Sequence, residues 1–246
     1  MSYEKVVLIL GGTGEAFELA AMINALTGWR AVTSMAGRTK RPRRPVGEVI
    51  FGGFGGPEGL GRCLAERGAL AMIDATHPFA SQITRNAVQA CTKAEIPLLR
   101  LDRPPWLVRQ SWRLVSDIGE AARLFRGRKE RVFLTIGKKE LGEFGNVGDS
   151  FFLIRTVDPV EASPSNNNHE FVTGRGPYSV EGELQIMRDY GITWLVTKNS
   201  GGEVGMSKLI AAEQAGVSIC VIERPKLPEC ESVETPAEAA RWLERL

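Results

Sequence analysis

The feature of this chain that most constrains its fold is a regular alternation of short apolar runs with segments of helical spacing. Residues 6–10 are a continuous run of valine, leucine and isoleucine, typical of a strand buried on both faces. Residues 15–26 carry apolar side chains at helical spacing, and Gly28 predicts the end of that helix. The same pattern predicts strands at 29–35, 49–51, 70–74 and 97–100, and helices at 58–67 and 78–93. Strands that alternate with helices of this length indicate βαβ units and a parallel sheet.

The alternation is interrupted at residues 103–106, Arg-Pro-Pro-Trp, which we interpret as a linker. A second series follows, with strands expected at 113–115, 132–136, 151–155, 192–196 and 218–222 and helices at 118–125, 138–144, 180–190 and 206–215. We expect residues 158–176 to be irregular and 236–246 to form a short terminal helix. The sequence therefore predicts an α/β fold of two small doubly wound parallel-sheet lobes, Rossmann-like or flavodoxin-like, at 1–105 and 106–246, with a cleft between them.

Charge and composition exclude several classes of protein. The chain has 31 lysines and arginines against 29 acidic residues, and a net charge of +2 is too small for a general nucleic-acid binder. No run approaches the ~18 apolar residues of a membrane span, and the first apolar run is too short for a signal peptide. The four cysteines show no CxxC spacing, and there are only two histidines. We therefore expect a cytoplasmic protein with reduced cysteines and no metal site.

A glycine-rich turn follows the first predicted strand, at Gly11-Gly12-Thr13-Gly14. Backbone N–H groups in such a turn, together with the N-terminus of the next helix, can bind a phosphate. The full dinucleotide fingerprint is absent, because its third small position falls on Phe17, and the lysine of a Walker A loop is absent too. The turn is interpreted either as a phosphate site or as an ordinary tight connection.

The end of the second predicted strand favours NADP over NAD. An NAD site would place an acidic residue in this window to bind the ribose, but residues 33–41 contain none. They contain Ser34, Arg38 and two further cations instead, which suit a 2′-phosphate. The alternative is a solvated basic loop.

Several motifs together resemble the precorrin-6A reductase family of cobalamin biosynthesis. In the first half these are GGTGEA at 11–16, AGRT at 36–39 and DATHPFA at 74–80. In the second half they are TIGK at 135–138, GRGPY at 174–178, TKNSGG at 197–202 and ERP at 223–225. The resemblance covers nearly the whole chain and implies NADPH-dependent reduction of a precorrin macrocycle. Residues 163–168 depart from the family pattern and are expected to be a loop insertion.

Candidate cofactor contacts are expected at the strand ends of the first lobe. They are Gly11, Gly12, Thr13, Gly14, Glu15, Ser34, Gly37, Arg38, Thr39, Gly53, Phe54, Gly55, Asp74 and Thr76. Asp74 and Thr76 are expected to bond ribose or phosphate hydroxyls. Phe54 would stack on the adenine or on the macrocycle, or else anchor a flexible turn. His77 is a candidate proton donor, or alternatively a cap for the helix expected to begin at Pro78.

Candidate substrate contacts are expected in the loops of the second lobe, where cations lie beside glycines. They are Lys138, Arg175, Gly176, Tyr178, Lys198, Asn199, Ser200 and Gly201. A precorrin carries several carboxylates, for which cations are the complementary groups. Each lone cation is otherwise a solvated charge, and Tyr178 would otherwise pack in the cleft. Lys198 is the second candidate catalytic residue.

We therefore predict an NADPH-dependent precorrin-6A reductase whose partner is a small-molecule tetrapyrrole, with no nucleic acid and no membrane. Transient contact with neighbouring pathway enzymes is a further expectation. The alternatives are a non-catalytic sensor of a nucleotide or anionic metabolite, and a cobalt-precorrin-6A reductase. A short-chain-type carbonyl reduction is disfavoured, because no tyrosine is followed four residues later by lysine.

Overall fold

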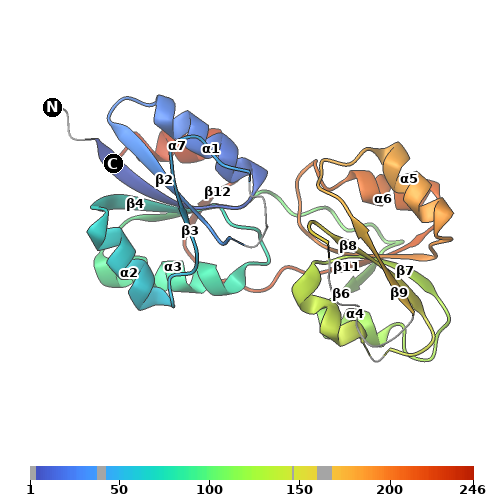
Figure 1. Ribbon diagram of the computed structural model, residues 1–246. Coiled ribbons are helices and arrows are strands. Elements are labelled where there is room, and N and C mark those ends of the chain that lie inside the picture. The colour runs from blue at the N-terminus through green and yellow to red at the C-terminus, as the bar shows by residue number, and fades with distance from the viewer. Residues whose placement is uncertain (1–3, 38–42, 146, 160–167) are drawn as a thin grey trace. The chain divides into compact units, whose positions relative to one another are not determined.

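The computed structural model describes residues 4–37, 43–145, 147–159 and 168–246 (Figure 1). The chain forms two compact units. Unit 1 comprises residues 1–104 together with 225–246, and unit 2 comprises residues 105–224. The chain thus crosses between the units twice, at Pro104–Pro105 and at Arg224–Pro225. The expected boundary after residue 105 lies one residue from the first crossing. The assignment of all of 106–246 to the second lobe is wrong, because the C-terminal segment returns to unit 1.

The described strands of unit 1 form a parallel sheet in the order β12-β5-β4-β1-β2-β3. Their bounds are β1 Lys5–Leu10, β2 Trp29–Met35, β3 Glu48–Phe51, β4 Ala69–Asp74, β5 Leu98–Leu101 and β12 Glu231–Val233. Its helices are α1 Gly14–Ala25, α2 Pro57–Glu66, α3 Ser81–Ala94 and α7 Pro236–Leu243. Helices α1 and α7 cover one face of the sheet, and α2 and α3 the other (Figure 1). This is the doubly wound arrangement in which the strand order reverses at β1 and β4.

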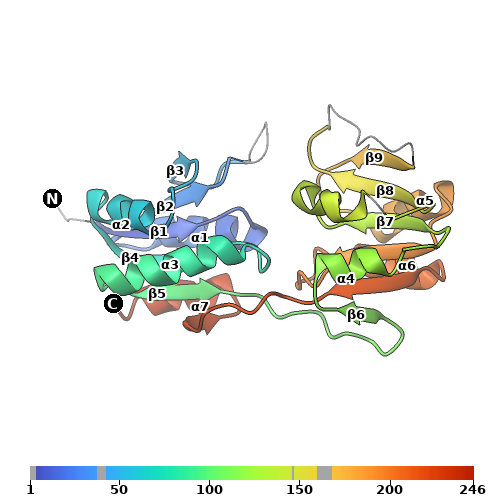
Figure 2. The same cartoon turned by 90° about the horizontal axis from the view of Figure 1, so that it is seen from below.

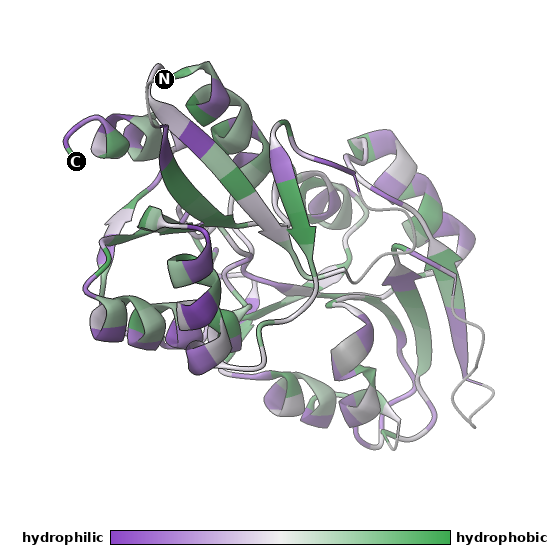
Figure 3. Cartoon of the chain, turned by 60° about the vertical axis from the view of Figure 1, so that its left-hand side comes forward, coloured by the Kyte–Doolittle hydropathy of each residue, from purple (hydrophilic) through white to green (hydrophobic). Residues whose placement is uncertain are grey.

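The sheet of unit 1 is buried on both faces, which explains the continuous apolar run of β1. Val7 and Ile9 belong to the core that contains α1 and α7, whereas Leu8 and Leu10 belong to the core that contains α2 and α3. Because successive strand residues point to opposite faces, each core needs an apolar residue at every second position. The helices carry both hydrophilic and hydrophobic residues, as expected for one packed and one exposed face (Figure 3).

The described strands of unit 2 form a second parallel sheet in the order β6-β11-β10-β7-β8-β9. Their bounds are β6 Arg113–Val115, β7 Arg131–Thr135, β8 Phe151–Thr156, β9 His169–Thr173, β10 Trp194–Lys198 and β11 Ser218–Ile222. The helices are α4 Ile118–Arg123, α5 Val180–Asp189 and α6 Ser207–Gln214, with a 3-10 helix, η1, at Lys138–Phe144. Helices α5 and α6 pack on one face of this sheet, and α4 and η1 lie on the other (Figure 2).

The strands of the two sheets follow the same spatial order, but one edge strand comes from a different place in the sequence of each unit. In unit 1 the edge strand beside β5 is β12, which follows all the other strands in sequence. In unit 2 the equivalent edge strand beside β11 is β6, which precedes the others. Each edge strand comes from the stretch of chain that adjoins a crossing.

Four local features differ from the sequence prediction. Helix α3 begins at Ser81, because Pro78 and Phe79 form a turn before it. The segment expected to be helical at 138–144 is a 3-10 helix. Strands β9 and β12 were not predicted; both are edge strands with few buried side chains, so neither has the apolar pattern of a central strand. Among the described residues, no helix has the length and apolar character needed to cross a membrane.

Candidate functional site

The reversal of strand order in unit 1 brings two loops together at the carboxyl edge of its sheet. The loop at 11–13 follows β1, and the loop at 75–80 follows the neighbouring β4. The Thr13 hydroxyl joins them, because its Oγ1 donates to the Ala75 carbonyl oxygen at 2.7 Å. The same Oγ1 accepts from the Ala16 N–H at 3.1 Å and so caps α1. Ligands of doubly wound proteins bind at such reversals, since the connecting helices leave toward opposite faces.

The glycines of the first loop meet two different demands. A Cβ on Gly11 would lie 2.8 Å from Cγ2 of Thr33, so the backbone can approach β2 only without a side chain. Gly12 has a φ of +112°, which L residues rarely adopt. A Cβ on Gly12 or Gly14 would meet nothing within 4 Å, so the backbone at both faces open space. The turn is therefore tight, as one reading expected, and also accessible, as a phosphate site requires.

A shallow depression lies beside this loop, within unit 1. The lining residues are Thr13, Glu15, Ala75, Thr76, Pro78, Leu101, Asp102 and Arg103. Arg103 Nη1 lies 2.8 Å from each carboxylate oxygen of Glu15, which is on the first turn of α1. Arg103, which was expected to belong to a linker, thus lines the site without having been predicted to do so. The available signal was its position just after β5, at the same edge as the glycine loop.

The Asp74 carboxylate accepts hydrogen bonds from neighbouring residues of unit 1 and does not line the depression. Its Oδ1 accepts from the Thr76 N–H at 3.0 Å and from the Thr76 hydroxyl at 2.6 Å. Its Oδ2 accepts from the Thr84 hydroxyl at 2.6 Å and from Arg100 Nη1 at 2.8 Å. The side chains of Asp74 and Arg100 are 1% and 5% exposed. Both carboxylate oxygens of Asp74 thus have partners within unit 1, where they hold the loop after β4 and the Thr76 hydroxyl, and its contact with cofactor hydroxyls stays a prediction.

His77 lies in the loop after β4, but it does not cap a helix. Helix α3 has Ala80 at its N-cap position, and His77 Nδ1 instead accepts from the Phe79 N–H at 3.2 Å. The two rings are tilted against each other with centroids 5.9 Å apart. With Nδ1 as an acceptor, the neutral imidazole carries its proton on Nε2.

The remaining first-lobe candidates lie at the ends of β2 and β3. Ser34 is buried, and its carbonyl oxygen accepts from the Gly11 N–H at 2.8 Å. Phe54 packs against the core that contains α2 and α3, which supports its reading as an anchor for the turn. Gly37 and Gly55 have positive φ, and a Cβ on Gly53 would meet no atom within 4 Å. Arg38 and Thr39 lie outside the described residues.

Unit 2 reverses its strand order between β7 and β10, and the TIGK and TKNSGG loops follow these two strands. Lys198, the last residue of β10, has its Nζ 2.7 Å from Oε1 of Glu140 on η1. Lys138 is exposed at the start of η1. Glu140 was not a candidate in the sequence analysis, because nothing local marks it as the partner of a residue so distant in sequence. Among the side chains that the structure describes, this edge thus carries the exposed Lys138 and the paired Lys198.

The GRGPY motif after β9 is partly structural. The Tyr178 ring lies under the Arg155 guanidinium, 4.0 Å from its centroid, and burial raises the pKa of Tyr178. Arg155 in turn binds both carboxylate oxygens of buried Glu183, at 2.6 and 2.7 Å. A Cβ on Gly176 would lie 3.3 Å from the Tyr178 ring, so this glycine makes room for it. Tyr178 therefore packs against Arg155 within unit 2, while Arg175 is exposed.

Asn199 and Ser200 follow Lys198 in the second loop. Asn199 is 7% exposed, and its side chain bonds the backbone of Trp106. Both polar atoms of the Asn199 side chain thus have partners within unit 2, and its direct contact with substrate stays a prediction. Ser200 and Gly202 are half-buried, and Gly201 is buried. Among the described residues, no cluster of histidine, cysteine and carboxylate side chains could hold a metal ion.

Two doubly wound units, each with loops gathered at a reversal of strand order, define a two-unit Rossmann-type protein. Comparison with known proteins makes this class specific: the chain belongs to the family described as precorrin-6x reductase CbiJ/CobK, whose model matches residues 6–244. Both the fold class and the family expected from the sequence are confirmed.

Curated relatives and one solved structure match over nearly their full lengths. A precorrin-6A reductase of Rhodococcus erythropolis is 44% identical, with 96% of each chain covered. One of Mycobacterium tuberculosis is 42% identical, again with 96% of each chain covered. A solved structure titled "CobK precorrin-6A reductase" has a TM-score of 0.92 and 37% identity, covering 98% of this chain and 96% of that one. A cobalt-precorrin-6A reductase of Methanothermobacter thermautotrophicus is 27% identical, covering 90% of this chain and 77% of its own.

Proposed function

We propose that this chain reduces metal-free precorrin-6A with NADPH in cobalamin biosynthesis. The observation that carries the proposal is the match over 96% of the chain, at 44% and 42% identity, to proteins named precorrin-6A reductase. Relatives named for the cobalt-containing substrate are more distant, at 27% identity for two of them. That difference favours the metal-free substrate.

Unit 1 is proposed to hold NADPH. The open backbone at Gly12 and Gly14 and the N-terminus of α1 suit the pyrophosphate, with Arg103 beside them. Arg38 and Ser34 are proposed, from the sequence alone, to recognise the 2′-phosphate. NADPH would supply the hydride, so the contribution of unit 1 is binding and orientation.

Unit 2 is proposed to hold the macrocycle through its carboxylates. Lys138 and Arg175 are exposed cations at the carboxyl edge of the sheet, and Lys198 lies at the same edge. Ammonium and guanidinium groups there complement a polyanionic tetrapyrrole. Ser200 and Gly201 complete the proposed contacts, while Asn199, Gly176 and Tyr178 support them.

Reduction of a conjugated double bond adds a hydride to one atom and a proton to its partner. His77 is proposed as one source of the proton in its imidazolium form, and the neutral ring, whose Nδ1 accepts from the Phe79 N–H, must take up a proton before it can act as the acid. Lys198 is the other candidate, and its ion pair with Glu140 keeps its Nζ in a defined position. Replacing each in turn, as His77→Gln and Lys198→Gln, distinguishes them: loss of the proton donor lowers kcat more than it raises KM.

We also propose a cytoplasmic location, since the four cysteines are free thiols, as in proteins of reducing compartments.

The direct test follows the absorbance of reduced nicotinamide while the purified protein is mixed with precorrin-6A. Parallel reactions contain cobalt-precorrin-6A, a simple carbonyl compound, or no substrate. The proposal expects turnover with precorrin-6A and markedly less with the cobalt form. Preference for the cobalt form would reassign the substrate, and NADPH binding without turnover on any substrate would indicate the sensor.

A second test concerns the choice of cofactor. Arg38→Ala should weaken NADPH binding and leave NADH binding nearly unchanged, because only NADPH has the 2′-phosphate. An equal loss for both cofactors would remove Arg38 from the 2′-phosphate site.

A further inference from the structure

The loop at 198–202, which follows β10, is held by both of the segments that connect unit 2 to the rest of the chain. Arg224, the last residue of unit 2, donates from Nε to the Asn199 carbonyl oxygen at 3.0 Å and from Nη2 to the Ser200 carbonyl oxygen at 3.1 Å. Trp106, next to the first residue of unit 2, donates from Nε1 to the Gly202 carbonyl oxygen at 2.8 Å. Three carbonyl groups of this loop are therefore fixed from outside the loop.

The Asn199 side chain makes a second connection to the entering segment. Its Oδ1 accepts from the Trp106 N–H at 2.8 Å, and its Nδ2 donates to the Trp106 carbonyl oxygen at 3.2 Å. The Asn199 side-chain amide thus pairs with both the N–H and the carbonyl group of Trp106, as the backbone of an adjacent β-strand does. Only a side chain with both a donor and an acceptor at this length can do so. Both residues are 7% exposed, so an unpaired group here would be costly.

Trp106 is itself fixed by packing. Its indole occupies the space left by the missing side chain of Gly205, where a Cβ would lie 2.5 Å from Cζ2 of the ring. Lys208 belongs to α6, and its Nζ lies 5.2 Å from the centroid of the Trp106 ring. Trp106 also belongs to the core that contains α5 and α6. The entering segment is therefore a rigid support for the loop.

The loop adopts a backbone shape that needs this support. Gly201 and Gly202 have φ values of +68° and +72°, and the Ser200 N–H donates to the Lys198 carbonyl oxygen at 2.7 Å. Glycine is flexible in isolation, so the external hydrogen bonds are what select one conformation. The side chains of Lys198 and Ser200 project from this fixed backbone.

We propose that Asn199 and Arg224 are positioning residues that hold Lys198 and Ser200 in place for the precorrin by tying the 198–202 loop to both connecting segments. This inference rests on the proposed function of unit 2 and adds two residues that act through the loop and need not touch substrate. A displacement of ~1 Å at a substrate contact can cost up to a hundredfold in rate.

The test compares Arg224→Ala, Arg224→Lys and Asn199→Ala with the unaltered full-length protein. We expect KM for precorrin-6A to rise by about ten- to a hundredfold in the two alanine variants, while NADPH affinity measured without substrate stays within about twofold. Arg224→Lys should not restore KM, because the donors of an ammonium all lie on one nitrogen and do not reproduce the planar fork of the guanidinium. Added guanidinium ion, far below denaturing concentration, should partly restore Arg224→Ala, and methylammonium should not.

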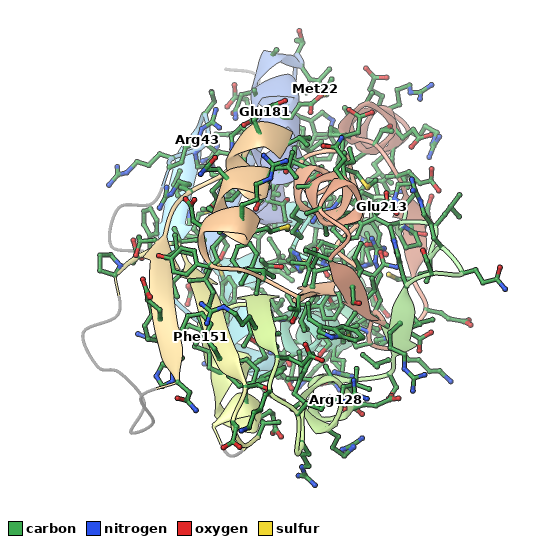
Figure 4. The ribbon with its side chains drawn as sticks, turned by 90° about the vertical axis from the view of Figure 1, so that its right-hand side faces the viewer. Met22, Arg43, Arg128, Phe151, Glu181 and Glu213 are labelled. Carbon is green, nitrogen blue, oxygen red and sulfur yellow. The ribbon has the colours of Figure 1, made fainter. Side chains whose placement is uncertain are left out.

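Two controls separate positioning from general stability. Arg109→Ala breaks an ion pair in the same unit, in which Arg109 Nη1 lies 2.6 Å from Oε2 of Glu213 on α6. Glu213 is labelled in Figure 4. This variant should leave both KM values unchanged. Amide hydrogen exchange should accelerate at residues 198–202 in Arg224→Ala but not in Arg109→Ala.

The outcomes distinguish this inference from the proposed function. Absence of turnover by the unaltered protein would overturn the proposed function, while hydrogen exchange would still report on the loop. Unchanged KM for precorrin-6A in the alanine variants, an equal loss of NADPH affinity, or unchanged exchange at 198–202 would each overturn the positioning role.

Discussion

Lys198 and Glu140 form an ion pair across the strand reversal of unit 2, with Nζ and Oε1 2.7 Å apart and side chains 12% and 31% exposed. The two residues come from β10 and η1, so the pair joins the two loops that the proposed substrate would meet. For the Lys198 ammonium to bind a carboxylate of the substrate, it must first give up its contact with the Glu140 carboxylate.

Glu140→Gln should therefore strengthen binding of precorrin-6A. Removing the competing carboxylate is expected to lower KM by about three- to tenfold, a modest change because the pair is partly solvated. Lys198→Met should raise KM instead, and steady-state kinetics at fixed NADPH measures both. A rise in KM with Glu140→Gln would mean that Glu140 orients Lys198 and does not compete with the ligand.

Arg103 should matter for the cofactor through Glu15. The pair places an arginine beside a carboxylate on the first turn of α1, where an uncompensated negative charge would repel a phosphate. Arg103→Gln is expected to weaken NADPH binding by about tenfold, and adding Glu15→Gln should recover part of the loss. Titration of NADPH without substrate gives the affinities. If the double variant binds no better than Arg103→Gln, then Arg103 acts directly on the cofactor and not by neutralising Glu15.

The buried pair of Asp74 and Arg100 should dominate the stability of unit 1. Arg100→Met leaves the Asp74 carboxylate without its charged partner at 1% exposure, which is expected to cost about 3–5 kcal/mol in the free energy of unfolding. Urea denaturation measures this change. Adding Asp74→Asn should recover a substantial part, because the remaining amide is neutral. Equal stability of the single and double variants would show that the loss comes from packing and not from charge.

The buried cysteines predict a loss of stability at high pH. Burial raises the pKa of the thiols of Cys91 and Cys220 to about 12, against 9.0 for an unburied thiol. The unfolded chain ionises first, so the stability that these thiols contribute is complete below about pH 9 and is lost as pH rises toward 12. Replacing both, as Cys91→Ala with Cys220→Ala, should flatten the fall in unfolding free energy between these values. An unaltered slope would contradict the burial of the thiols.

The same two thiols should resist modification. In the native protein a thiol reagent should react first with Cys63 and Cys230, which are half-buried, while Cys91 and Cys220 should react only after denaturation. Mass spectrometry of the labelled peptides identifies the sites.

The central strands could be predicted from the sequence because both of their faces are buried. A strand such as β1 must be apolar at every buried position, and the apolar run at residues 6–10 appears in the sequence. The edge strands β9 and β12 have mostly exposed or half-buried side chains, so they lack this pattern. Their strand conformation comes from pairing with β8 and β5, which a local reading does not contain.

The site was predictable where a loop must contain glycine and less so where side chains pair. Gly11 and Gly12 are needed for backbone geometry, so their pattern marks the loop. Arg100, Glu140 and Trp106, which pair with Asp74, Lys198 and Asn199, lie 26, 58 and 93 positions away in sequence. A pattern of neighbouring residues does not contain partners at such distances.

The return of the C-terminal segment to unit 1 has a consequence for biosynthesis. Trp242 of α7 is buried in the core that contains α1, and β12 forms the last hydrogen bonds of the sheet along β5. A nascent chain has completed all of unit 2 before those residues leave the ribosome. Unit 1, most of which is translated first, can therefore complete its core and its sheet only after unit 2 has been synthesised.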